Sequence, residues 1–119
     1  MIIDVSQEQG RVSVTVLRPH DRINMGNTEE LDQAADEAIR HGVKYVLIDL
    51  SDVPSITSAG LRSILNIGKK LGTDSAGQKK SSFLKLFNPS PTVLQVFKIA
   101  GFDALFEIHT DLKQALASF

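Results

Sequence analysis

The sequence of 119 residues contains no cysteine and no tryptophan, and Tyr45 is its single tyrosine. The lack of cysteine excludes disulfides, thiolate metal ligands and a cysteine nucleophile, and it fits a reducing compartment such as the cytoplasm. The scarcity of tryptophan and tyrosine argues against a platform that stacks nucleic-acid bases. Because the net charge is only −1, the chain has no general attraction for nucleic acid or anionic membranes.

Long hydrophobic runs are also missing. No apolar stretch approaches the roughly 20 residues that a membrane-spanning helix needs, and residues 1–9 lack the basic and then apolar pattern of a signal peptide. The composition, 42% hydrophobic and 23% charged, is ordinary for a globular protein. We therefore expect residues 1–119 to form one cytoplasmic α/β domain, monomeric and without a membrane anchor.

Alternating and continuous apolar runs predict the strands. Residues 2–6 and 11–17 have the alternation of a β-hairpin, and the apolar run at 45–50 is typical of a strand in the middle of a sheet. Two more strands are expected at 83–87 and 105–108. Strands that alternate with helices favour parallel pairing, so the hairpin at the start implies a mixed sheet.

Capping residues followed by apolar stripes predict four helices. Asn27 with Glu30 is expected to form a capping box at the first helix, which Gly42 ends. The second helix starts near Ser58, the third after residues 88–91, and the last is expected to be capped by Thr110. The Gly-, Lys- and Ser-rich residues 72–81 are expected to form a mobile loop.

The segment 49–61 carries the strongest functional signal, because it runs from the end of the central strand into a helix. Binding sites of open α/β sheets cluster at such ends, and the free N–H groups of a helix start favour an anion. A phosphate on Ser58, with the small Ala59 and Gly60 behind it, would add about two negative charges without unfolding the helix. A simpler interpretation, compatible with the first, is that Thr57 or Ser58 only caps the helix.

Catalytic and metal-binding patterns are weak by comparison. Ser58 lacks the first glycine of a G-x-S-x-G elbow, and no histidine is placed by a catalytic motif. Asp49 and Asp52 flank the loop, but no further ligand stands at metal-binding spacing, and Asp49 is more typical of a solvated or turn-forming residue. No glycine-rich phosphate loop is present. We therefore expect a binding module without metal or cofactor, and the alternative is a small enzyme or nucleotide-binding domain.

Three motifs, in four segments of the sequence, point to a known family; the first motif comprises the first two segments. Residues 46–51 read Val-Leu-Ile-Asp-Leu-Ser, and residues 56–62 read Ile-Thr-Ser-Ala-Gly-Leu-Arg. Residues 21–31 contain Asp-Arg-Ile-Asn, and residues 100–102 read Ala-Gly-Phe. This pattern resembles the STAS domain of bacterial anti-sigma factor antagonists over essentially the whole chain. That family has a strand ending in Asp-Leu-Ser and a segment of the type [Asp/Ser]-Ser-[Ser/Thr/Ala]-Gly-Leu that opens a helix. It also has an earlier Gly-x-Leu-Asp stretch and a late small-Gly-Leu/Phe turn.

The resemblance implies a mixed sheet with about four helices packed mainly on one face, and it implies partner switching. The unphosphorylated protein is expected to bind an anti-sigma factor, usually a serine kinase with a histidine-kinase-like ATPase domain, so that a sigma factor is released. The kinase then phosphorylates the serine that matches Ser58, and a PP2C-type phosphatase resets it. Thr57 is a second candidate acceptor. The expected partner-binding residues are Asp21, Asn24, Ser55, Thr57, Ser58, Ala59, Gly60 and Arg62.

Three positions depart from the family's usual pattern. Thr57 stands where aspartate often precedes the phosphorylated serine, Asn24 replaces the aspartate of the Gly-x-Leu-Asp stretch, and Asp21 replaces its glycine. These departures leave a second hypothesis open. The same fold could act as an unphosphorylated adaptor in a stress-sensing or transporter-associated complex.

Overall fold

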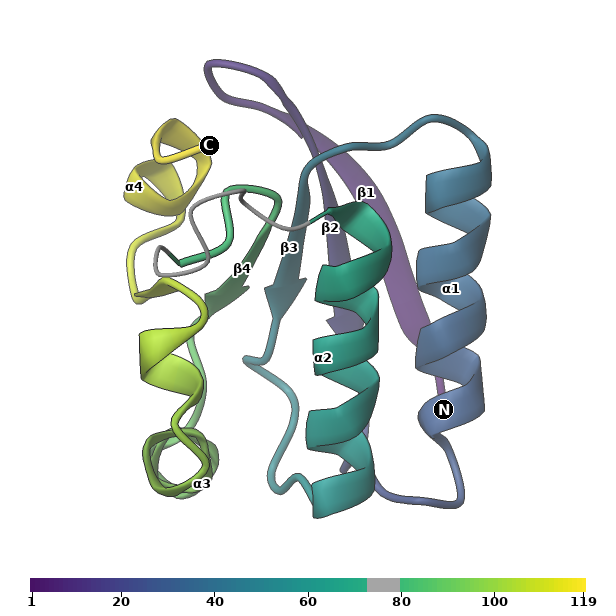
Figure 1. Ribbon diagram of the computed structural model, residues 1–119, viewed down its shortest axis with the longest axis vertical. Coiled ribbons are helices and arrows are strands. Elements are labelled where there is room, and N and C mark those ends of the chain that lie inside the picture. Colours follow the sequence, from purple (N-terminus) through teal and green to yellow (C-terminus); the bar gives the residue numbers. More distant parts are fainter. Residues whose placement is uncertain (73–79) are drawn as a thin grey trace.

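The computed structural model describes residues 1–72 and 80–119. Within this part of the chain a five-stranded sheet has the order β1-β2-β3-β4-β5 (Figure 1). The strands are β1 Ile3–Gln9, β2 Ser13–Pro19, β3 Val46–Asp49, β4 Leu84–Phe87 and β5 Ile108–His109. β1 and β2 are antiparallel, and every later pairing is parallel. The predicted mixed sheet is therefore confirmed, with the hairpin strands ending two or three residues later than expected.

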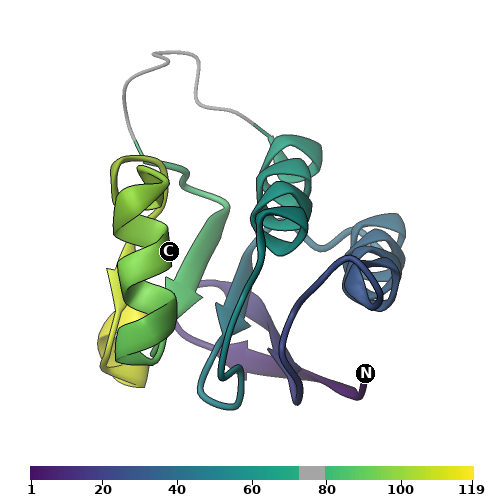
Figure 2. The ribbon, with the colours of Figure 1, turned by 90° about the horizontal axis from the view of Figure 1, so that it is seen from below.

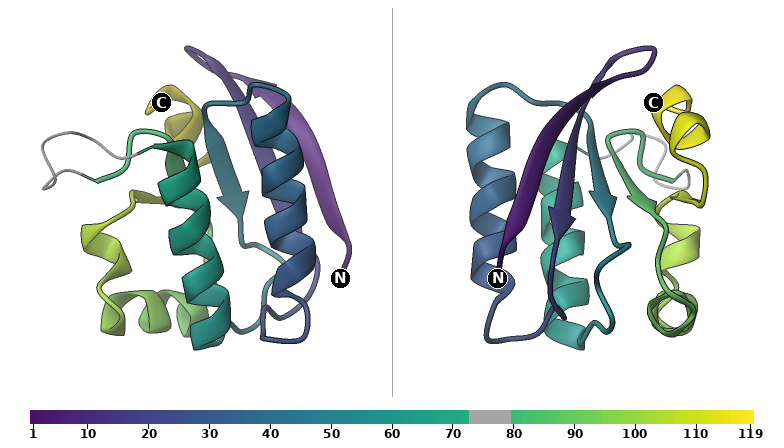
Figure 3. Two further views of the ribbon diagram at one scale, coloured as in Figure 1. Left: turned by 45° about the vertical axis from the view of Figure 1, so that its right-hand side comes forward. Right: turned by 180° about the vertical axis from the view of Figure 1, so that it is seen from behind.

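Four α-helices accompany the sheet in the described residues. They are α1 Thr28–Arg40, α2 Ser58–Leu71, α3 Pro91–Ile99 and α4 Leu112–Ala117. The helices α1 and α2 lie side by side on one face of the sheet, as Figure 2 shows. Seen from the other side, the strands lie in front of these two helices (Figure 3). No helix of residues 1–72 and 80–119 is long and apolar enough to cross a membrane.

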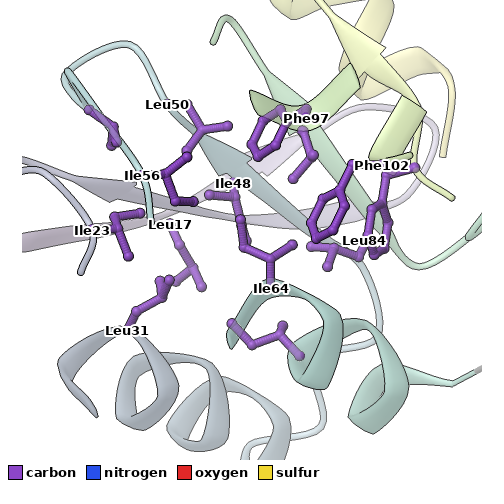
Figure 4. Close-up of a cluster of buried hydrophobic side chains, with 14 of the residues drawn as sticks. Leu17, Ile23, Leu31, Ile48, Leu50, Ile56, Ile64, Leu84, Phe97 and Phe102 are labelled. Carbon is purple, nitrogen blue, oxygen red and sulfur yellow. The ribbon is translucent and has the colours of Figure 1, made fainter. Parts of the chain in front are cut away.

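The main hydrophobic core lies between the sheet and α1, α2 and α3 (Figure 4). Strand residues such as Leu17 and Ile48 alternate inward and meet Leu31 of α1, Ile64 of α2 and Phe97 of α3. A smaller cluster occupies the opposite face. There α4 packs on the sheet through residues that include Val14, Val16, Leu47, Ala115 and Leu116. Most helices therefore cover one face, as expected, and α4 is the exception.

The predicted capping box at α1 is wrong. Asn27 is the N-cap residue, but its side chain makes no capping hydrogen bond. It is used in the preceding loop instead, where Asn27 Oδ1 accepts from Asn24 N at 2.9 Å. Glu30 pairs with the amino group of Met1 at 3.2 Å. The end of α1 agrees with expectation, because Gly42 has a φ of 88°.

Two predictions near the C-terminus are also wrong in detail. Asp111, not Thr110, caps α4, since its side chain accepts a hydrogen bond from Gln114 N at 3.0 Å. The expected strand at 105–108 lies later in the chain, as β5, because Leu105 N and Phe106 N donate to Phe102 O in the turn after a short 3-10 helix over Phe102–Ala104. The loop expected at 72–81 falls mostly on residues 73–79, which lie outside the described residues.

Candidate functional site

The loop before α1 and the loop before α2 meet at the lower end of the molecule in Figure 1. Ile23 pairs with Ile56 in an isolated parallel β-bridge. Its backbone N–H donates to Ser55 O at 3.0 Å, and its carbonyl accepts from Thr57 N at 3.0 Å. Two backbone hydrogen bonds thereby link two segments that are far apart in the sequence, immediately before α2 begins.

The close approach of α2 to this bridge depends on Gly60. Ile23 and Ile56 are buried in the main core (Figure 4), and Gly60 is buried against them. A Cβ atom on Gly60 would lie 2.6 Å from Ile56 Cγ1 and 2.8 Å from Ile23 Cγ2. These distances are far below an ordinary van der Waals separation, so a side chain at this position would push α2 away from the bridge.

Ser58 is the first residue of α2, and it is exposed. Thr57 occupies the N-cap position, as the simpler interpretation expects, but its side chain makes no capping hydrogen bond. Within the described residues the Ser58 hydroxyl has no hydrogen-bond partner. The first turn of α2 also contains no acidic residue. The Ser58 hydroxyl is therefore exposed at the N-terminus of α2, where the first turn supplies no negative side chain to interact with the positive end of the helix dipole.

The loop before α1 is held in shape by side-chain amides. Asn24 Oδ1 accepts from Gly26 N at 2.8 Å, and Asn27 Nδ2 donates to Arg22 O at 2.7 Å. An Asn24 carboxamide supplies the same acceptor oxygen that an aspartate would supply. The tip of the turn presents Met25, whose side chain is 83% exposed. Sequence reasoning missed Met25, because an isolated methionine in a loop carries no local signal.

The structure places all eight candidate site residues on these two loops or in the first turns of α2. Asp21 is exposed, and its Oδ1 accepts from Arg22 N at 2.7 Å. Ser55 and Arg62 are exposed, and Ala59 is half-buried. The exposed residues among them are polar, and Met25 is a large apolar side chain exposed on the loop before α1.

The carboxylates beside this surface are engaged in structural contacts. Asp49 is 7% exposed and accepts from Ser51 Oγ at 2.6 Å, so it forms a turn and is not solvated. Asp52 pairs with Arg18 at 3.0 Å and with His20 at 2.8 Å. Among residues 1–72 and 80–119, no group of three His, Asp or Glu side chains is placed to hold a metal ion.

Comparison with known proteins identifies the family. Residues 5–115 match the model of the STAS domain. The chain belongs to the STAS domain family. The Bordetella bronchiseptica protein BtrV, provisionally named an anti-sigma factor antagonist, is 31% identical over 97 residues, which are 82% of this chain and 78% of BtrV. A provisionally named anti-sigma factor antagonist of Thermotoga neapolitana is 32% identical over 104 residues, 87% of each chain.

Solved structures agree with the family assignment. The crystal structure of a provisionally named anti-sigma factor antagonist from Thermotoga maritima superposes with a TM-score of 0.74 at 29% identity, covering 87% of this chain and 84% of that one. The unphosphorylated form of the anti-sigma factor antagonist SpoIIAA has a TM-score of 0.63 at 19% identity, over 98% and 94% of the chains, and shows the shared fold alone. The resemblance predicted from the sequence motifs is confirmed.

Proposed function

We propose that this STAS domain is an anti-sigma factor antagonist that binds its partner through the surface around Ser58, and that phosphorylation of Ser58 abolishes binding. The names of the relatives support an anti-sigma factor as the partner. The observation that carries the proposal is the exposure of Ser58 at the first residue of α2, beside a loop fastened by the bridge between Ile23 and Ile56.

A phosphate at this position acts through charge more than through shape. The start of α2 tolerates a dianion, because the helix dipole is positive there and the first turn carries no carboxylate. The backbone can therefore stay as it is while the surface gains about two negative charges. A partner that covers Ser58 would have to bury an unpaired charge, which costs a few kcal/mol and weakens binding roughly a hundredfold or more.

The remaining parts of the proposed switch come from the resemblance to anti-sigma factor antagonists. The partner is a serine kinase with a histidine-kinase-like ATPase domain, which binds the unphosphorylated surface and transfers a phosphoryl group to Ser58. A PP2C-type phosphatase removes it. The domain itself is regulatory, not enzymatic, and acts as a cytoplasmic monomer.

Binding measurements with a purified anti-sigma factor kinase test the proposal. Titration calorimetry should give similar affinities for the wild type and Ser58→Ala, and at least about a hundredfold loss for Ser58→Asp. Thr92→Asp is the matched control, because Thr92 is also exposed in the first turn of a helix, α3, that has no acidic residue in that turn. If Ser58→Asp binds the kinase with the same affinity as the wild type, the proposal is wrong. Recovery of a membrane transporter component in a pull-down would favour the adaptor hypothesis instead.

A further inference from the structure

Arg62 lies one helical turn after Ser58 on α2. Side chains four residues apart project from the same face of a helix, with their Cβ atoms about 5–6 Å apart. Both Ser58 and Arg62 are exposed. The long Arg62 side chain can therefore bring its guanidinium to a group attached to the Ser58 oxygen without any change of the backbone.

The Arg62 guanidinium has no competing partner in the described residues. By contrast, Arg18 pairs with Asp52 at 3.0 Å, and Arg40 pairs with Glu37. The carboxylates of α1 that face α2 are also occupied. Asp32 accepts from Ser63 Oγ, and Asp36 accepts from Lys70 Nζ at 2.8 Å.

The helix itself offers Arg62 no carboxylate either. The positions three and four residues away on α2 hold only uncharged residues, namely Ser58, Ala59, Leu65 and Asn66. A phosphate on Ser58 would be the first anion within reach of this guanidinium along its own helix. Arginine favours phosphate because its planar fork donates two parallel hydrogen bonds to two phosphate oxygens.

We propose that Arg62 is the intramolecular receptor of the phosphate on Ser58. The inference rests on the proposed phosphorylation of Ser58 and adds its regulation. In the unphosphorylated protein Arg62 is available to an anionic group of the partner. In the phosphorylated protein the same guanidinium is bound to the phosphate, so one modification changes two groups of the docking surface. The phosphate adds repulsion, and the loss of Arg62 removes attraction.

The titration of the phosphate reports this ion pair directly. The second pKa of a phosphoserine is about 6, and a neighbouring guanidinium stabilises the dianion and lowers that pKa. Phosphoserine can be placed at position 58 by genetic code expansion, so the experiment needs no kinase. The ³¹P chemical shift is then followed from pH 4 to 8 in the full chain and in variants of it.

The variants distinguish a direct effect of Arg62 on the phosphate pKa from the combined electrostatic effect of the protein's other charges. Arg62→Gln should raise the phosphate pKa by about half a unit or more relative to the wild type, and Arg62→Lys should give an intermediate value. Lys69→Gln, an exposed change near the other end of α2, and Arg22→Gln, a change in the loop before α1, should leave it nearly unchanged.

An unchanged pKa in Arg62→Gln would overturn the inference. An equal rise of the phosphate pKa in Arg62→Gln and Lys69→Gln would also overturn it, because it would indicate only the combined effect of many charges. A rise of this pKa confined to Arg22→Gln would overturn it too, because it would place the receptor in the loop before α1. Because the phosphoserine is installed directly, none of these results depends on whether a kinase modifies Ser58. The binding experiment with Ser58→Asp tests that separate question.

Discussion

Ile23 and Ile56 form an isolated parallel β-bridge that fastens the loop before α1 to the loop before α2. This single pairing makes the candidate docking surface a composite of two distant stretches of sequence. The bridge is buried, whereas the residues that it positions are exposed. Substitutions in the bridge should therefore change stability and binding together, and substitutions of exposed loop side chains that make no structural hydrogen bond should change binding alone.

Gly60→Ala should destabilise the fold by about 1–3 kcal/mol, because the added methyl group overlaps the buried side chains of Ile23 and Ile56. Thermal unfolding measures this loss. Asn66→Ala, an exposed change on the same helix, is the control and should stay within about 0.5 kcal/mol of wild type. If the two variants unfold alike, α2 has room to move at the bridge and the close approach is not a constraint.

Asn24→Ala should loosen the turn before α1, since Gly26 N loses its acceptor at 2.8 Å. The expected cost is about 1 kcal/mol, with faster exchange of the Gly26 amide proton and several-fold weaker partner binding. Asn24→Asp keeps the acceptor oxygen and should behave much more like wild type. Unchanged exchange of the Gly26 amide in Asn24→Ala would contradict the role given to this side chain.

Met25→Ala should weaken binding to the proposed anti-sigma factor partner by about tenfold, because methionine is enriched at protein interfaces and an exposed apolar side chain is stabilised when docking removes it from water. Met25 is 83% exposed, so the stability of the free protein should hardly change. Ile99→Ala is the matched control, since Ile99 is 80% exposed on α3, away from the two loops. Equal losses in both variants would place the interface elsewhere.

A partly buried ion pair links the C-terminal end to the opposite face of the sheet. Lys85 is 2% exposed, and its Nζ donates to Ser118 O at 2.6 Å and pairs with Glu107 Oε2 at 3.0 Å. Partial burial alone would raise the pKa of the Glu107 carboxyl. Hydrogen bonds from Lys85 and His109 outweigh that effect and hold this pKa below its usual value.

The depressed pKa makes the stabilisation by Glu107 dependent on pH. Its contribution is present above the unfolded-state pKa of about 4.3 and is lost as the pH falls through the lower folded-state pKa. Glu107→Gln should therefore be less stable than wild type at pH 7, and the difference should shrink below about pH 4. Denaturant unfolding at several pH values measures it, with the exposed Glu8→Gln as control. A difference that stays constant with pH would contradict this account.

Local patterns predicted most of the fold. Apolar alternation and capping residues predicted the hairpin, the central strand and the helix that begins at Ser58, because these signals act over a few residues. The recruitment of Asn27 to the preceding loop could not be predicted, since an asparagine at that position is equally suited to capping.

Long-range contacts explain the other failures. The residues near Lys85 in the sequence do not predict that its ammonium group will contact Glu107 and Ser118, which lie far along the chain. The pairing of Ile23 with Ile56 likewise depends on how two loops meet after the sheet has formed. The candidate site residues around Ser58 could be proposed from the motif, whereas the exposed Met25 emerged only from the folded arrangement.

The most direct test of the central claim is phosphorylation. The purified protein is mixed with ATP, magnesium and each candidate anti-sigma factor kinase, and intact mass and peptide mapping locate any modification. We predict the gain of one phosphate on Ser58, abolished by Ser58→Ala. Absence of phosphate with every kinase would contradict the switch and favour an unphosphorylated adaptor, and phosphate on Thr57 would contradict the assignment of the site to Ser58.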